Sequence, residues 1–139
     1  MSSWNDSLLI GVENIDNQHR DLVNRMDQLF DACCRGIGED EAGDTIKFIV
    51  SYVNAHFKDE EELQSIKLYP DAAAHKKLHA DFVKRIIDLI QELKAGNSTD
   101  FAKKVNKTLI DWFITHIRTE DKKFGAHLHI ETAMKKFKS

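Results

Sequence analysis

Four long stretches in which apolar residues recur every three or four positions constrain the fold of this chain more than any other feature. That spacing places apolar side chains on one face of an α-helix, so it predicts four amphipathic helices. We place them at about residues 17–36, 41–65, 70–94 and from Ser98 or Thr99 to near Gly125. The chain has one proline and six glycines, too few for the many hairpins of a sandwich or barrel. The sequence therefore predicts an all-α fold.

The connections between these stretches are short, which favours neighbouring helices that run antiparallel. We therefore expect an up-down-up-down four-helix bundle. The length of 139 residues fits a single domain. Within it we expect an N-terminal arm at residues 1–16, the bundle at 17–125 and a short C-terminal tail at 126–139.

Charge, hydropathy and cysteine content exclude several classes of protein. The formal net charge is −3, whereas a nucleic-acid-binding protein would show a basic face. No apolar run approaches the roughly 18 residues that span a bilayer, and the first residues lack the basic region of a secretory signal. Cys33 and Cys34 are adjacent and cannot form a disulfide framework, which suits a reducing compartment. We expect a cytoplasmic protein without nucleic-acid or membrane partners.

Histidine is the unusual residue, because the chain has seven and five of them fall on the apolar stripes. Residues four positions apart project from the same face of a helix. His75 and His79, for example, continue the line of Phe82 and Ile86 toward the core. The residues that share such inward positions are five histidines and one glutamate: His19, His56, Glu60, His75, His79 and His116.

The antiparallel topology brings these six residues to one end of the bundle. They lie at the start of the first and third helices and near the end of the second and fourth. A single inward histidine is more often a core residue with its own hydrogen bonds than a ligand. Burying this many polar groups together costs several kcal/mol unless each finds a partner. A metal site satisfies all of them at once, so the pattern predicts one.

The size of the set bears on which metal it holds. A closed zinc site needs about four ligands, fewer than this cluster offers. Imidazole combined with carboxylate suits iron, copper, nickel or zinc. Two ions bridged by carboxylates would use the whole set, and helical bundles are known to hold di-iron centres.

The combined motif resembles the hemerythrins, and most closely the stand-alone bacteriohemerythrins. The resemblance covers about residues 4–124 and implies the same fold, since myohemerythrin is itself an up-down-up-down bundle. It rests on four segments in order: Ile15-Asp16-x-Gln18-His19, His56-Phe57-x-x-Glu60-Glu61, His75-x-x-x-His79 and His116-x-x-x-x-Asp121.

The resemblance also implies a ligand set for two iron ions. His75, His79 and His116 would bind one iron, and His19 and His56 the other. Glu60 and Asp121 would bridge both irons together with an oxo or hydroxo group. The first iron would then have six ligands and the second five, and dioxygen would bind reversibly at the open position of the second.

The last ligand conflicts with regular helix geometry. Asp121 follows His116 by five residues, which turns it roughly 140° away on an α-helix. From periodicity alone Glu120 is the rival, at four residues. The resemblance favours Asp121, and a π-type turn near residues 116–121 would reconcile the two.

The ligand set favours binding over turnover. Five neutral imidazoles replace most of the anionic charge that carboxylate-rich di-iron oxidases carry, so we do not expect an enzyme. We expect storage, delivery or buffering of dioxygen. The alternatives are a sensor of oxygen, redox state or nitric oxide, or a peroxidase-type enzyme, and the Lys-rich tail leaves room for a protein partner. The residues that we expect beside the two-histidine iron are Leu22, Phe57 and Trp112.

Overall fold

The computed structural model describes residues 3–94 and 99–138, and every regular element in these ranges is helical. The predicted cap at Ser98 lies outside the described residues. The elements are η1 (Asp6–Leu8), α1 (Glu13–Cys34), α2 (Glu39–Ile66), α3 (Ala72–Lys94), α4 (Thr99–His116), the π-helical turn η2 (Ile117–Asp121) and α5 (Lys122–Lys138).

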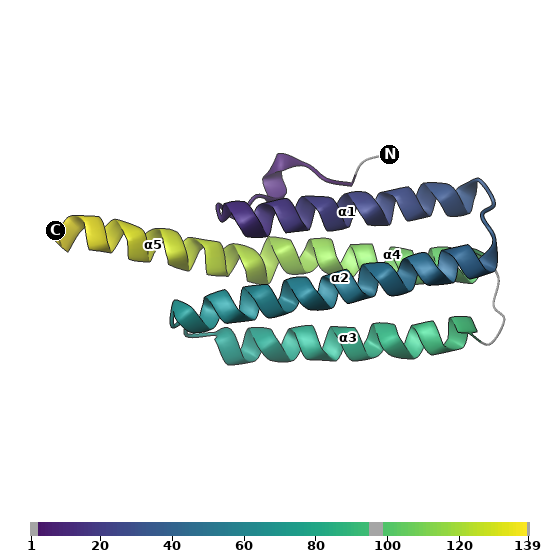
Figure 1. Ribbon diagram of the computed structural model, residues 1–139. Helices are drawn as coiled ribbons and strands as arrows, with labels where there is room; N and C mark the ends of the chain where they lie inside the picture. The colour runs from purple at the N-terminus through teal and green to yellow at the C-terminus, as the bar shows by residue number, and fades with distance from the viewer. Residues whose placement is uncertain (1–2, 95–98, 139) are drawn as a thin grey trace.

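Helices α1 to α4 run antiparallel to their chain neighbours and form one bundle (Figure 1). Helix α1 packs on α2 and α4, and α3 packs on the same two helices. This arrangement confirms the predicted four-helix bundle. It places the start of α1, the end of α2, the start of α3 and the end of α4 at one end of the molecule.

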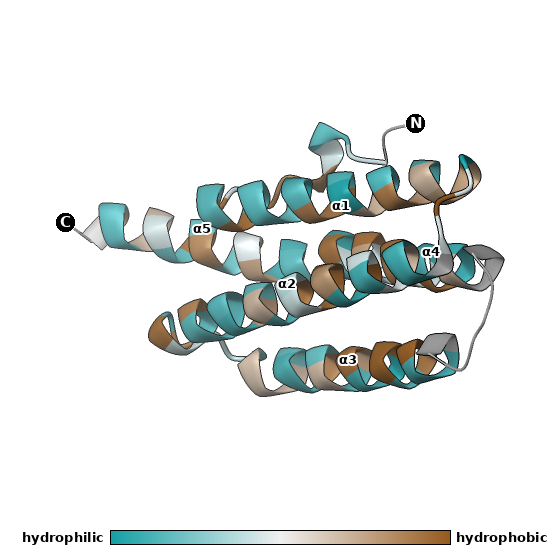
Figure 2. Cartoon of the chain, turned by 45° about the vertical axis from the view of Figure 1, so that its right-hand side comes forward, coloured by the Kyte–Doolittle hydropathy of each residue, from teal (hydrophilic) through white to brown (hydrophobic). Residues whose placement is uncertain are grey.

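The apolar stripes form the core of the bundle. The brown, hydrophobic positions in Figure 2 alternate with teal positions along each helix, as the 3.6-residue period requires. Leu22, Met26, Ile46, Ile86 and Leu109 are each no more than 1% exposed. The core is continuous along the bundle, and the buried polar residues other than Asn106 lie toward the end where α5 leaves it.

The N-terminal arm ends earlier than predicted, because α1 begins at Glu13 rather than at residue 17. Asp16 is therefore inside the helix and does not cap it. Its buried carboxylate instead accepts hydrogen bonds from the backbone N–H groups of Ile10 (2.8 Å) and Gly11 (3.0 Å). The arm then passes close to α5, where a Cβ on Gly125 would collide with the carbonyl oxygen of Ile10.

The predicted helix end near Gly125 is wrong. The chain stays helical from Thr99 to Lys138, and Gly125 lies inside α5. Glycine at this position is explained by the close approach of the arm, not by a helix stop. The predicted tail is therefore a helix that projects beyond the bundle (Figure 1). Among the described residues, no helix is both long and apolar enough to cross a membrane.

Candidate metal centre

The seven side chains of the predicted ligand set lie together at one end of the bundle. They come from α1 (His19), α2 (His56, Glu60), α3 (His75, His79), α4 (His116) and η2 (Asp121). All are at most 4% exposed. The pairs four residues apart in α2 and α3 share one helix face, so each helix aims both of its groups inward.

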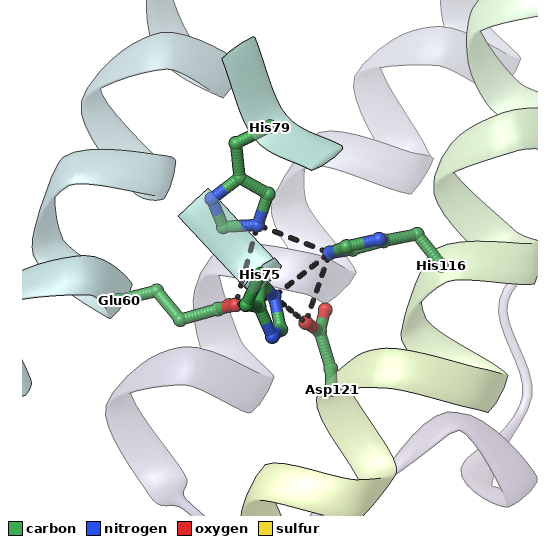
Figure 3. A group of neighbouring side chains, drawn as sticks. All are labelled: Glu60, His75, His79, His116 and Asp121. Atoms are coloured by element: carbon green, nitrogen blue, oxygen red, sulfur yellow. Dashed lines mark hydrogen bonds and ion pairs between the residues drawn. The ribbon is translucent and has the colours of Figure 1, made fainter. Parts of the chain in front are cut away.

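Five of these residues form the three-histidine set: Glu60, His75, His79, His116 and Asp121 (Figure 3). The Nε2 atom of His116 lies 3.0 Å from that of His75 and 3.0 Å from that of His79. The Nε2 atom of His75 is also 2.7 Å from Glu60 Oε1 and 3.0 Å from Asp121 Oδ1. Potential ligand atoms of all five residues lie within 4.8 Å of one another.

The two-histidine set joins the same carboxylates to α1: His19, His56, Glu60 and Asp121. His19 Nε2 lies 3.1 Å from Asp121 Oδ2 and 3.7 Å from Glu60 Oε2. His56 Nε2 lies 3.3 Å from the same Glu60 oxygen. Each shared carboxylate thus turns one oxygen toward each set.

The π-helical turn settles which acidic residue after His116 faces the cluster. The wider turn at Ile117–Asp121 rotates Asp121 inward, where it is fully buried. Glu120 instead points outward and lies 3.6 Å from the amino group of Lys123. The π-type turn that would reconcile Asp121 with helix geometry is therefore present, and Glu120 lies outside the cluster.

The donor atoms of this cluster fit a bound cation. In the described part of the chain, the two oxygens of Glu60, the two of Asp121 and both ring nitrogens of His19 have no hydrogen-bond partner. Orphaned buried polar groups are costly, and so are imidazole lone pairs that face one another. Two ligands at right angles, each about 2.1 Å from a metal, lie about 3.0 Å apart. That separation matches the Nε2 distances of the three-histidine set.

In the metal-free chain, protons on some of the histidines partly take the place of bound cations beside the buried carboxylates. Burial by itself lowers the pKa of His19 and His75, but the nearby carboxylates outweigh it and raise both pKa values to about 9. Burial lowers the pKa of His56. Burial would raise the pKa of Asp121, yet neighbouring histidines hold it at about 2, and they hold the pKa of Glu60 well below its usual value. The carboxylates are thus anionic and ready to bind a cation.

Three of the histidines have a polar side chain at Nδ1, the outer ring nitrogen that faces away from the cluster. Two of these side chains are Gln18 and Glu61. His56 Nδ1–H donates to Gln18 Oε1 (2.6 Å), and Gln18 in turn donates to Asp59. His79 Nδ1–H donates to Glu61 Oε2 (2.9 Å). These contacts fix the ring orientation of the histidines.

Gln64 is the partner that sequence reasoning missed, although it follows Glu60 by one helical turn. Its Nε2 lies 3.1 Å from His75 Nδ1, while its Oε1 has no partner among the described residues. The carboxamide is nearly symmetric in shape. Turning it by 180° would let Oε1 accept the Nδ1–H that a histidine bound through Nε2 must carry.

The aromatic side chains expected beside the two-histidine iron differ in their positions. Phe57 stacks on His79 at 3.8 Å and also lies 5.9 Å from His56, so it borders both sets. Trp112 stacks on His116 at 4.5 Å and flanks the three-histidine set. Phe113 is the ring that contacts both His19 (5.5 Å) and His56 (5.9 Å). Trp112 and Phe113 are adjacent on α4 and point to different sides of the cluster. The apolar stripe of the sequence includes both residues, so it could not show which of them lies beside which set. Leu22 is fully buried in the core.

Comparisons with known proteins agree with this geometry. The sequence model of the family described as "Hemerythrin HHE cation binding domain" matches residues 10–128. The Bacteriohemerythrin of Stenotrophomonas maltophilia (strain R551-3) is 34% identical over 130 residues, which cover 91% of this chain and 83% of that protein. The Myohemerythrin of Theromyzon tessulatum is 29% identical over 127 residues, covering 90% and 92%.

A crystal structure of wild-type hemerythrin is similar over the whole bundle, with a TM-score of 0.78 and 30% identity. The alignment covers 89% of this chain and 95% of that one. The chain therefore belongs to the hemerythrin family of non-haem di-iron oxygen-binding proteins.

Proposed function

We propose that this protein holds two iron ions and binds dioxygen reversibly, for storage, delivery or buffering of oxygen. His75, His79 and His116 would bind one iron, and His19 and His56 the other. Glu60 and Asp121 would bridge them, together with an oxo or hydroxo group. The cytoplasmic location expected from the sequence stays a prediction.

The arrangement of the two carboxylates carries this proposal. Glu60 Oε1 faces His75 while Oε2 faces His56, and Asp121 Oδ1 faces His75 while Oδ2 faces His19. A carboxylate that serves one ion needs no such division of its oxygens. The two donor sets overlap in these two residues alone, which is the pattern expected of a bridged pair.

The donor count supports an open position on one iron. The three-histidine set offers five residues and the two-histidine set offers four. With the same bridging group on both, the iron held by the two-histidine set would have one ligand fewer. We assign the dioxygen site to that iron.

The bound irons would supply the reversible exchange of electrons with dioxygen, which side chains alone cannot provide. The chain orients the histidine rings and excludes water. Gln18, Glu61 and Gln64 orient three imidazole rings so that Nε2 faces the centre. Phe113 covers the two-histidine set and keeps water from the dioxygen site. The buried acids and bases of the cluster would themselves be ligands, which leaves none of them free to act as a general acid or base.

The test is an absorption spectrum of the full chain, reduced without air, then oxygenated, then purged with inert gas, with metal analysis on the same sample. We expect two irons per chain and a visible band that appears with oxygen and fades on purging. Immediate irreversible oxidation would favour the sensor, and steady turnover of peroxide or nitric oxide would favour the enzyme. A chain with no iron, or with zinc alone, would refute the proposal.

A further inference from the structure

A groove runs along the surface between α2 and α3, beside the three-histidine set. It consists of two adjoining hollows of about 380 and 310 Å³ that share Asn54, Val83 and Ile87. Its lining is largely apolar, and Ile87 is 43% exposed. About four turns of α2 separate Lys47 at one end from Glu61 at the other, which is about 20 Å of helix. That length suits the face of another protein better than a small molecule.

Four exposed lysines line this groove: Lys47, Lys58, Lys76 and Lys84. Within residues 3–94 and 99–138, no ion pair joins any of them to a carboxylate. The one acidic residue in the described lining is Glu61, whose carboxylate accepts the hydrogen bond from His79. The groove is therefore strongly basic in a chain whose net charge is −3.

The opposite flank of α2 has the reverse charge. A hollow of about 490 Å³ between α1 and α2 is lined by Glu13, Asp59 and Glu62, and no lysine or arginine is among its described lining residues. The charges of the chain are thus separated across α2 rather than mixed. A protein with an acidic face would be attracted to the α2/α3 groove and repelled from the α1/α2 hollow.

The α2/α3 groove also reaches the metal centre directly. His79 lines the groove, while its Nε2 faces the other ligands. Phe57, stacked on the same ring, lines it as well. No ligand histidine lines the α1/α2 hollow, where Gln18 and Asp59 intervene. A partner seated in the α2/α3 groove would therefore contact His79, whose ring alone separates it from the centre of the three-histidine set.

We propose that the α2/α3 groove is the docking surface for an acidic one-electron carrier protein, which returns electrons to the oxidised centre through His79. The inference rests on the proposed function, because iron that has been oxidised to Fe(III) must be reduced before it binds dioxygen again. Each encounter transfers one electron from the reduced carrier. Two encounters return both irons to Fe(II), the carrier is oxidised, and no covalent bond of this chain changes.

The two helix faces of α3 supply a matched pair of variants. Lys76 and Lys84 line the groove, whereas Lys77 and Arg85 are also exposed, lie beside them in sequence and are not among its lining residues. The double variants K76E/K84E and K77E/R85E change the net charge by the same amount. Neither pair belongs to the ligand set.

The rate experiment follows reduction of the ferric, iron-loaded chain by a reduced, acidic plant-type ferredoxin in a stopped-flow instrument. At low salt, we expect K76E/K84E to lower the second-order rate constant about 10-fold or more, and K77E/R85E less than about threefold. The difference should shrink at high salt, because ions screen exposed charges. Equal slowing by both double variants would show that overall charge, rather than the groove, controls the encounter, and would overturn the proposal.

A second readout does not depend on iron chemistry. A carbodiimide joins lysine amines directly to carboxylates in contact with them. We expect cross-links from Lys58, Lys76 or Lys84 to ferredoxin carboxylates, and mass spectrometry locates them. Cross-links from these lysines to Asp59 or Glu62 of a second copy, or no cross-links at the groove, would overturn the proposal. Unchanged iron content and oxygen-dependent absorption in K76E/K84E would show that the proposed function stands whether or not docking does.

Discussion

The two halves of the metal centre differ in how firmly the chain holds them. In the three-histidine set, His75 and His79 have polar partners on their outer nitrogens, and Phe57 and Trp112 stack on ligand rings. In the two-histidine set, His56 alone has such a partner among the described residues. The half with more donors is thus also the better braced half. We infer that the first half anchors iron, while the second keeps a position free for a ligand.

The halves also face different surroundings. The hydrogen bond from His79 to Glu61 leads to the basic α2/α3 groove, and the chain from His56 through Gln18 to Asp59 leads to the acidic α1/α2 hollow. The two sets that share Glu60 and Asp121 thus face environments of opposite charge. The predictions below test how far the halves are independent.

The largest effect should come from Glu60→Ala, which removes a donor from both halves at once. We expect the iron content to fall from two per chain to less than one, because both sets lose a donor and only Asp121 remains as a shared carboxylate. His79→Ala, which touches the three-histidine set alone, should leave more iron bound than Glu60→Ala. Glu62→Ala on the exposed side of α2 is the control. Two irons in Glu60→Ala would mean that Glu60 is not a shared ligand.

The second prediction concerns pH and applies to both halves of the metal centre alike. His19 in one half and His75 in the other have pKa values raised from 6.5 to about 9 in the chain without metal. Their contribution to stability is complete below pH 6.5 and is lost as the pH rises through about 9, by on the order of 2–4 kcal/mol together. Iron competes with these protons, so its binding strengthens over the same range.

Urea unfolding of the metal-free and iron-loaded chains at pH 6.5 and pH 9 measures this effect. The stability gained from iron should be larger at pH 9 than at pH 6.5. A gain that is equal or smaller at pH 9 would contradict protonation of these histidines in the metal-free chain.

The third prediction concerns metal retention, on which the two halves should differ. Removing a side chain that orients a ligand histidine typically weakens metal binding about 10–100-fold. We expect Gln18→Ala to lie at the upper end of that range, because it leaves the two-histidine set with no brace. Gln64→Ala should cost less, since Glu61 still holds His79. The rate of iron loss to a chelator measures both, with exposed Asn17→Ala as the control. Faster loss from Gln64→Ala would reverse the proposed ranking.

The smallest effect concerns the aromatic cover. Phe113→Leu keeps most of the buried volume but opens space beside His19 and His56. We expect it to speed oxidation of the oxygenated protein several-fold by admitting water. Trp112→Phe, on the three-histidine side, should change that rate less. Time courses of the visible band in air compare the two, and a larger effect of Trp112→Phe would place the dioxygen site on the other half.

Much of the bundle, and the gathering of the histidines with Glu60 at one end of it, could be predicted from the chain alone. Apolar spacing located four helices, and the i, i+4 pairs in α2 and α3 indicated inward faces because helix geometry depends only on local sequence. The end near Gly125 was not predictable, because that glycine is explained by Ile10 of the arm, more than a hundred residues away. The start of α1 at Glu13 rather than residue 17 was missed for a similar reason, since Asp16 binds the backbone of the arm from inside the helix.

The sequence by itself determined which residues face inward and, through short connections, at which end of the bundle they meet. Tertiary structure decided how their atoms are divided: which oxygen of Glu60 and Asp121 faces which set, that Phe113 rather than Trp112 covers His19, and that Gln64 meets His75. Periodicity fixes the direction of a side chain only to within a broad sector of the helix. Distances of a few ångströms between different helices depend on how those helices pack.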